Sequence, residues 1–282
     1  MATVTTIPFA LTGADGAPLR GEVRTAAGGR DRPAVVICHG FKGFKNWGFF
    51  PHLALRLARS GITAITFNFS GSGVGPDGES FSEPERFSRS TPTGDLQDLA
   101  TVWEALAEGA LAAAVARPTK LGVFGHSRGG AAAIIHAARH SNCGAIVTWA
   151  AISSYARWGS RTVAKWRESG SLDIVNARTG EVLPLRLDYL EDLERNEHVL
   201  DPATAAGQIS APWLLVQGSV DEAVPVRESK LLFAHVSKDV ARLEIVEAGS
   251  HTMGARHPWG GWTPQLERAV DLTLEWFVRH LL

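Results

Sequence analysis

The stretch 121–130 constrains the fold more than any other part of the sequence. It reads Leu-Gly-Val-Phe-Gly-His-Ser-Arg-Gly-Gly, and the helix-forming run 131–138 follows it. Apolar β-prone residues, a glycine-rich turn and a helix predict a sharp strand-to-helix turn with Ser127 at its tip. Gly125 and Gly129 flank the serine, where strand and helix pass too closely for a Cβ atom. The helix N-terminus offers backbone N–H groups to negative charge developing beside the serine.

A Gly-x-Ser-x-Gly pattern also arises by chance in ordinary glycine-rich turns, so the rest of the chain has to support this interpretation. Helical periodicity over 47–60, 94–109, 225–236 and 264–281 alternates with short apolar runs. These runs predict eight strands, over 4–11, 18–25, 34–38, 62–69, 119–124, 144–151, 212–217 and 242–246. The alternation predicts an α/β fold with a mostly parallel eight-stranded sheet flanked by helices.

The alternation breaks between residues 152 and 208. This segment is rich in charges, contains helical stretches such as 186–197, and has no run typical of a buried strand. We therefore predict a small inserted cap over 152–208, and one core domain formed by 1–151 and 209–282. A length of 282 residues suits a single large α/β domain with such an insertion.

Composition excludes several classes of partner. The formal net charge is −1 and charged residues make up 20% of the chain, so no strong field attracts nucleic acid or an anionic membrane. No apolar run is long enough to span a bilayer, and residues 1–8 lack the features of a secretory signal. We expect a cytoplasmic protein. A homodimer is compatible with the sequence.

The sequence predicts no metal and no cofactor. Its two cysteines, Cys38 and Cys143, lie at the ends of predicted strands and are expected to be buried free thiols. No His, Cys, Asp and Glu set has metal-ligand spacing. The Gly-Ser-Gly of residues 71–73 lacks the Gly-x-Gly-x-x-Gly pattern and a following helix, which argues against a nucleotide site.

Polar residues with catalytic chemistry follow several predicted strands. In an open α/β sheet, function gathers at the carboxyl ends of the strands. A serine nucleophile needs a base to take its proton and a third group to orient that base. His251 follows the last strand and Asp221 the strand before it, which gives the chain order Ser, Asp, His.

Each of these residues has an alternative interpretation. His251 could be an ordinary loop histidine, and His257 is a rival base further from the strand end. Asp221 could cap the helix that starts near Pro225, and Glu222 could replace it as the acid. The strand that follows the nucleophile ends without a carboxylate, which favours Asp221. His39 and His126 flank the site and are expected to be structural, with their ring nitrogens bonded to nearby loops.

Together these motifs resemble the α/β-hydrolase superfamily over nearly the whole chain. The matching residues are His-Gly-Phe at 39–41, Gly-His-Ser-x-Gly-Gly at 125–130, Gly-x-x-Asp-x-x-Val-Pro at 218–225 and Gly-x-His at 249–251. Within it, the chain resembles small bacterial feruloyl and cinnamoyl esterases. By that resemblance, the backbone N–H groups of Phe41 and Arg128 form the oxyanion hole. Those esterases more often carry glutamine at the position of Arg128, a difference that concerns substrate preference.

The resemblance implies a serine hydrolase that cleaves small-molecule carboxylic esters through an acyl-enzyme on Ser127. Four tryptophans are candidates for the substrate pocket, although packing within the core or cap explains them equally well. These are Trp149, Trp158, Trp166 and Trp259.

Four rival functions stay open. One is an acyl-transfer or perhydrolase activity, which would depend on the exclusion of water by the cap. An acyl thioesterase could use the same triad, with a basic cap entrance formed by Arg157, Arg161, Lys165 and Arg167. A peptidase usually carries a large extra domain, which this sequence does not contain. A non-catalytic protein of the same fold commonly lacks a member of the triad, whereas all three are present here.

Overall fold

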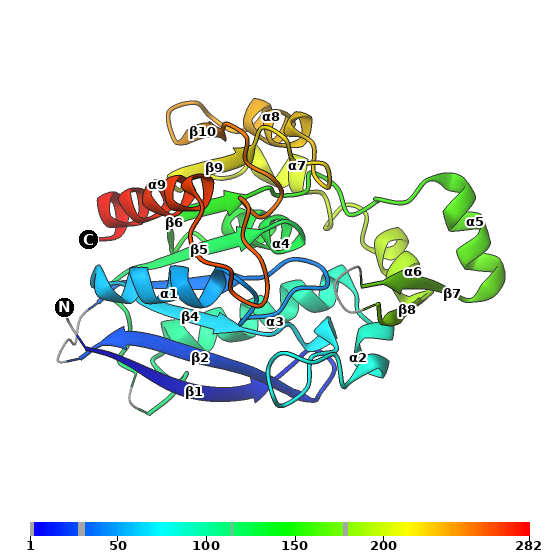
Figure 1. Ribbon diagram of the computed structural model, residues 1–282, viewed down its shortest axis with the longest axis horizontal. Coiled ribbons are helices and arrows are strands. Elements are labelled where there is room, and N and C mark those ends of the chain that lie inside the picture. Colours follow the sequence, from blue (N-terminus) through cyan, green and yellow to red (C-terminus); the bar gives the residue numbers. More distant parts are fainter. Residues whose placement is uncertain (1–2, 28–31, 114, 177–179) are drawn as a thin grey trace.

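A computed structural model describes residues 3–27, 32–113, 115–176 and 180–282. Residues 177–179 of the predicted cap lie outside this part of the chain, as do residues 1–2. The chain forms the predicted eight-stranded, mostly parallel sheet with helices on both faces (Figure 1). Its strands are β1 Val4–Thr12, β2 Pro18–Ala26, β3 Ala34–Cys38, β4 Thr63–Phe67, β5 Leu121–His126, β6 Cys143–Trp149, β9 Trp213–Gly218 and β10 Ala241–Val246.

The strand order places the candidate site. The order is β1-β2-β4-β3-β5-β6-β9-β10, in which β1 and β2, and β2 and β4, pair antiparallel and all other neighbours pair parallel. The chain runs from β3 toward one edge and then returns to place β5 on the other side of β3. This reversal opens a crevice at the carboxyl ends of β3 and β5. The loops after these two strands carry Phe41 and Ser127.

Each face of the sheet has its own apolar core. Every residue of β3, β4 and β5 is buried, because helices cover both sides of these strands. On one face they pack against α1 Phe50–Arg59 and α9 Pro264–Leu281. On the other they pack against α3 Pro92–Ala107, α4 Arg128–Arg139 and α8 Val226–His235. Alternate strand residues point to opposite cores, as the strand repeat of two requires.

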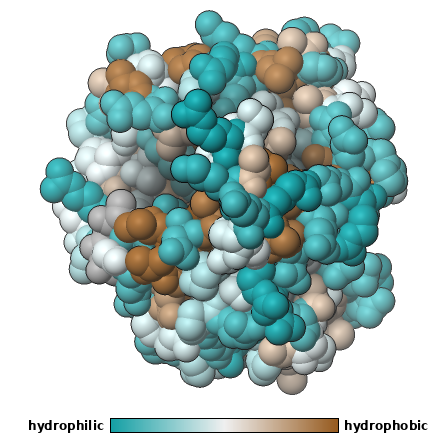
Figure 2. Space-filling view, turned by 90° about the vertical axis from the view of Figure 1, so that its right-hand side faces the viewer, coloured by the Kyte–Doolittle hydropathy of each residue, from teal (hydrophilic) through white to brown (hydrophobic). Residues whose placement is uncertain are grey.

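The segment between β6 and β9 projects from the carboxyl end of the sheet. It contains α5 Ser160–Ser169, β7 Ser171–Val175, β8 Val182–Arg186, α6 Asp188–Arg195 and α7 Pro202–Ala206. In Figure 1 its first four elements extend away from the end where both termini lie. The fifth element, α7, packs on α4 and α8. Figure 2 looks onto this end of the molecule and shows a largely hydrophilic surface with small hydrophobic patches.

Two local features differ from the sequence expectation. The strands β7 and β8 form an antiparallel hairpin where mixed helices and loops were expected. The sequence did not predict these strands because their residues alternate in exposure and form no buried apolar run. The helix expected to begin near Thr93 or Gly94 begins at Pro92. Thr91 is its N-cap, and the Thr91 hydroxyl accepts from the backbone N–H of Gly94 at 3.1 Å.

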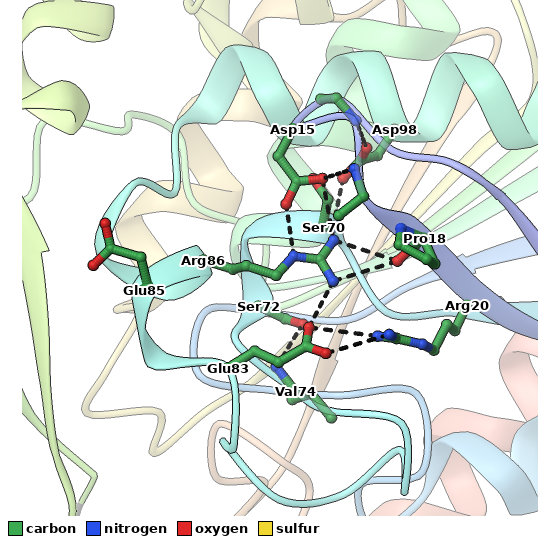
Figure 3. A network of polar contacts seen from close by, with 12 residues as sticks. Asp15, Pro18, Arg20, Ser70, Ser72, Val74, Glu83, Glu85, Arg86 and Asp98 are labelled. Atoms are coloured by element: carbon green, nitrogen blue, oxygen red, sulfur yellow. Dashed lines mark hydrogen bonds and ion pairs between the residues drawn. The ribbon is translucent and has the colours of Figure 1, made fainter.

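A polar network fixes the loop after β4 (Figure 3). Arg86, on the short helix α2 Pro84–Ser88, contacts the Asp15 and Glu83 carboxylates, each at 2.6 Å. The Asp98 carboxylate accepts from the backbone N–H groups of Ala14 at 2.7 Å and Ser70 at 2.6 Å. The network ties the β1–β2 turn to α2, α3 and the loop 70–73, which borders the crevice between β3 and β5.

Candidate active site

Ser127 occupies a strained position between β5 and α4. Its backbone φ is 56° and ψ is −121°, in a region that residues other than glycine rarely adopt. A Cβ atom added at Gly125 would lie 2.3 Å from the carbonyl oxygen of Gly129. One added at Gly129 would lie 2.3 Å from the carbonyl oxygen of His39. The two glycines therefore let β5, α4 and the end of β3 meet around the serine.

We expect Gly125→Ala to lower the free energy of unfolding by about 3 kcal/mol or more, because rigid backbone atoms surround the added methyl group. Gly207→Ala is a matched control. Gly207 has a helical φ of −67°, and a Cβ there would make only ordinary contacts at 3.5 Å. Urea unfolding of both variants tests this, and equal stabilities would show that the turn is not packed this closely.

His251 and Asp221 form a hydrogen-bonded pair. The Nδ1 atom of His251 lies 2.9 Å from Oδ2 of Asp221. The Nε2 group of Gln217 donates to the same oxygen at 3.0 Å, and the backbone N–H groups of Ala223 and Val224 donate to Oδ1, each at 2.9 Å. Burial of Asp221 opposes its charge, but these hydrogen bonds and the histidine outweigh burial and lower the pKa of the carboxyl. An ionised Asp221 orients the histidine ring.

The rival residues lie elsewhere. His257 accepts from the backbone N–H of Gly48 through Nδ1 at 3.3 Å and contacts the rings of Phe44 and Trp47. Glu222 is exposed, and Asp221 does not cap α8, whose N-cap is Pro225.

Ser127 and His251 line the same cavity, which we call the Ser127 pocket. Its volume is about 170 Å³, and its other lining residues include Phe41, Trp47, Phe50 and Asn176. Asn176 follows β7, whose last residue, Val175, accepts from Lys42 Nζ through its carbonyl oxygen at 3.2 Å. The β7–β8 hairpin thus reaches over the loop after β3 and contributes to the pocket.

The loop after β3 presents Phe41 to the Ser127 pocket. The backbone N–H of Phe69 donates to Nε2 of His39 at 3.2 Å, so His39 carries its proton on Nδ1 and donates to the carbonyl oxygen of Gly40 at 2.9 Å. A turn closed by the Gly43 N–H on the Gly40 carbonyl then follows, with Lys42 at a positive φ of 57°. Arg128 follows Ser127 as the first residue of α4, where backbone N–H groups have no partner within the helix.

The four candidate tryptophans lie outside the Ser127 pocket in the part of the chain that the structure describes. Trp149 is 0% exposed and donates to the Thr273 hydroxyl at 2.9 Å, on the face covered by α9. Trp166 is buried within the inserted segment, and Trp259 stacks on His52 with 3.7 Å between ring centroids. Trp158 meets the ring of Phe41 edge-on at 6.5 Å and so contacts the pocket only indirectly.

The aromatic lining instead comes from Phe41, Trp47 and Phe50. Of these, Trp47 and Phe50 were missed because they lie just before α1 and at its first residue, where the sequence shows no catalytic motif. The one available signal was their position in the sequence, a few residues after the His-Gly-Phe motif of the predicted site.

His39 and His126 are buried and structural, as predicted. The Nε2 group of His126 donates to the carbonyl oxygen of His251 at 2.9 Å. Burial lowers the pKa of His39 to about 4 and that of His126 to about 3. Both rings are therefore neutral near pH 7 and hold the two loops without adding charge.

His136 offers a test of this pattern away from the site. It is 2% exposed on α4 and packs on Trp103, and burial lowers its pKa from 6.5 to about 3. Below pH 6.5 the unfolded chain binds a proton at this histidine that the folded protein does not bind. The free energy of unfolding therefore falls by about 1.4 kcal/mol for each unit by which the pH is lowered. We expect His136→Leu to remove this contribution between pH 6 and pH 4, in urea unfolding followed at both pH values. Ile134→Val, a buried apolar change on the same helix, should leave the pH dependence unaltered; a parallel curve for His136→Leu would contradict the prediction.

No group of three or more His, Cys, Asp or Glu side chains within the described ranges is arranged to hold a metal ion. Among the described helices, none has the length and apolar character that crossing a membrane requires. Cys38 and Cys143 are buried free thiols, as predicted.

Comparisons with solved structures agree with this architecture. A putative hydrolase from Agrobacterium vitis is 20% identical, with both chains covered completely and a TM-score of 0.71. Est1E from Butyrivibrio proteoclasticus, solved with ferulic acid bound, is 19% identical over 95% of this chain and 98% of its own, with a TM-score of 0.70. A puromycin-hydrolyzing peptidase from Mycobacterium tuberculosis is 22% identical over 99% of this chain and 39% of its own, with a TM-score of 0.66. No curated protein matches the chain.

The fold is that of the α/β hydrolases, which these neighbours share. A family model places the chain more closely: residues 47–282 match the prolyl oligopeptidase family, and the chain belongs to it.

Proposed function

We propose that the protein hydrolyses small-molecule carboxylic esters with Ser127, His251 and Asp221 as its catalytic triad. The observation that carries this proposal is the common pocket of Ser127 and His251, with His251 bonded to a buried carboxylate. His251 takes the proton of Ser127, whose oxygen attacks the ester carbonyl. The backbone N–H groups of Phe41 and Arg128 stabilise the tetrahedral oxyanion. His251 then protonates the leaving alcohol, and water repeats the steps on the acyl-enzyme.

The size and lining of the Ser127 pocket favour a short or aromatic acyl group. Its volume of about 170 Å³ is close to that of cavities that bind benzene, which measure about 150 Å³. Phe41, Trp47 and Phe50 give it apolar walls. Est1E, a structural neighbour, was solved with ferulic acid, a molecule of this class. We infer that acetyl, butyryl and cinnamoyl-type esters fit and long acyl chains do not.

A peptidase is the second candidate, and the family match favours it. The same triad would attack an amide, and the pocket would then hold a small or aromatic side chain of the peptide. The thioesterase alternative has weaker support. Arg157 is bonded to Glu228, and Arg167 to Glu194, so two of the four cap cations are neutralised by carboxylates.

Hydrolysis of a substrate panel tests the proposal. The panel holds p-nitrophenyl esters from acetate to palmitate, methyl ferulate, aminoacyl p-nitroanilides and an acyl-CoA. We expect kcat/KM for short and aromatic esters to exceed that for palmitate by about tenfold or more. Faster cleavage of an anilide than of every ester would instead establish the peptidase, and activity on the acyl-CoA alone would establish a thioesterase.

A further inference from the structure

The side chain of Arg128 is buried although the residue directly follows Ser127 in the chain. The residue is only 5% exposed. Its Nε group donates to Oδ2 of Asp95 at 2.6 Å, and its Nη2 group donates to the Ser90 hydroxyl at 3.0 Å. Asp95 lies in the first turn of α3, so the guanidinium crosses from α4 to the start of α3. A planar guanidinium bound in this way has a fixed orientation.

Two aromatic rings lie against the guanidinium. Its central carbon, Cζ, is 5.3 Å from the ring centroid of Phe41 and 5.3 Å from that of Tyr189. Both distances fall within the range of cation–π contacts, which strengthen when water is excluded. Phe41 carries one of the two N–H groups assigned to the oxyanion hole, and Arg128 carries the other. The guanidinium of Arg128 therefore packs against the ring of Phe41.

Tyr189 extends this contact to the inserted segment. It lies on α6, and its hydroxyl donates to the carbonyl oxygen of Tyr155 at 3.3 Å. From the same helix, the Asp192 carboxylate accepts from the Thr93 N–H at 2.9 Å and from the Thr93 hydroxyl at 2.6 Å. Helix α6 is thus docked on the N-terminus of α3, next to the Asp95 that holds Arg128.

Direct binding of substrate by the guanidinium is a different explanation, which the surrounding space argues against. The cavity that Arg128, Asp95 and Ser90 line behind Phe41 has a volume of about 20 Å³. That is room for one water molecule and not for a substrate group. Arg128 is also absent from the lining of the larger Ser127 pocket within the described residues.

We propose that the Arg128 side chain is a positioning residue that fixes Phe41 in the oxyanion loop and couples the docking of α6 to the geometry of the oxyanion hole. This inference rests on the proposed function of Ser127. Because Asp95 balances the charge of Arg128, the effect depends on the planar shape and hydrogen bonds of the guanidinium more than on its charge. Burial raises the pKa of Asp95 to about 6. Burial opposes the charge of Arg128, but the Asp95 carboxylate outweighs it and the pKa of Arg128 is raised, so both groups are ionised at pH 8.

The test uses Arg128→Lys, Tyr189→Leu and the double variant. Lysine keeps the positive charge and the backbone N–H. It lacks the planar guanidinium group and the fixed set of hydrogen-bond donors which that group provides. Two quantities are measured at pH 8: kcat and KM for the best ester, and the rate at which a fluorophosphonate probe labels Ser127. A control, Arg56→Lys, alters an arginine that also pairs with an aspartate, Asp271, and faces a ring, Trp262, on the surface.

We expect Arg128→Lys to lower kcat and the labelling rate by about 10- to 100-fold while KM changes less than about threefold, since small displacements of catalytic groups have effects of this size. Tyr189→Leu should lower both rates by a smaller factor. The kcat and labelling rate of the double variant should lie within about twofold of those of Arg128→Lys, because both changes act through one contact. The control should match the unaltered protein.

Other outcomes separate the inference from the proposed function. If the unaltered protein is not labelled at Ser127, the proposed function fails. If it is labelled, and Arg128→Lys labels within about twofold of it or shows only a raised KM, the positioning role is overturned. Effects that multiply in the double variant also overturn the coupling. Should Arg128→Lys not fold, Tyr189→Leu carries the test by itself, and an unchanged kcat in that variant rejects the inference.

Discussion

Replacing Ser127 by alanine is expected to lower kcat for ester hydrolysis by about 10⁴- to 10⁶-fold, as loss of the nucleophile does in other serine hydrolases. Without the hydroxyl, His251 has no proton to take and no acyl-enzyme forms. The remaining donors at Phe41 and Arg128 would still bind an oxyanion, so a residual rate above that in water should persist. Steady-state hydrolysis of a p-nitrophenyl ester, with mass spectrometry for the acyl-enzyme, measures both effects.

Ser154→Ala provides the matched control for this experiment. Ser154 is exposed, follows β6 and makes a local hydrogen bond with the backbone N–H of Ala156 at 3.1 Å. Its loss should leave kcat within about twofold, in line with most surface substitutions. A Ser127→Ala protein that folds and keeps more than a tenth of the activity would exclude Ser127 as the nucleophile.

The fold could be predicted because its local signals agree with its tertiary packing. The run 34–38 forms a strand with those bounds, since parallel strands covered on both faces consist of continuous apolar residues. The helix 264–281 also has the expected bounds. Pro264 suits its first turn, and the Thr263 hydroxyl accepts from the Leu266 N–H at 3.1 Å, so the start is encoded in adjacent residues.

The inserted segment was harder to predict because its pairing is local and exposed. In β7 and β8 the opposed Val175 and Val182 are 57% and 55% exposed, and no buried run marks either strand. The signal of a half-exposed hairpin is weak unless a recognisable turn joins its strands. Burial against α2 and α6, which the sequence does not reveal, accounts for the position of this hairpin.

The positions of the candidate catalytic residues follow from the sequence more readily than the walls of the pocket do. Ser127, Asp221 and His251 each follow a strand, and the parallel sheet brings such loops to one edge. Trp149 ends a strand at the same edge, yet its ring points into the core. Side chains alternate between the two faces along a strand, so position at the strand end does not decide where a ring points.

Asp221→Asn is expected to lower kcat by about 10⁴-fold, the size of effect that this exchange has in the serine protease triad. The hydrogen bonds around Asp221 explain why. The Ala223 and Val224 N–H groups both donate to Oδ1, so the carbonyl oxygen of an asparagine would occupy that position. Its NH₂ group would then take the place of Oδ2 and face His251 and Gln217.

Gln217 cannot turn to accept from that NH₂ group. Its Oε1 accepts from the Ser229 hydroxyl at 2.6 Å and its Nε2 donates to the Val224 carbonyl at 2.9 Å, which fixes the orientation of its amide. The NH₂ group and a protonated Nδ1 of His251 would also be two donors facing each other, and this second conflict is relieved only if His251 presents an unprotonated Nδ1 and carries its proton on Nε2. In that tautomer the nitrogen that should accept the Ser127 proton is already occupied.

The expected signature of Asp221→Asn is therefore a large fall in kcat with a small change in KM and a folded protein. Glu222→Gln is the matched control, since it removes a neighbouring carboxylate that is exposed. Steady-state kinetics of both variants, with ¹⁵N spectra of the His251 ring to identify its tautomer, separate the possibilities. A loss in Glu222→Gln and full activity in Asp221→Asn would transfer the role of the acid to Glu222. An inactive Asp221→Asn protein with a proton on Nδ1 would refute the tautomer argument, because the base would then be correctly set and the loss would need another cause.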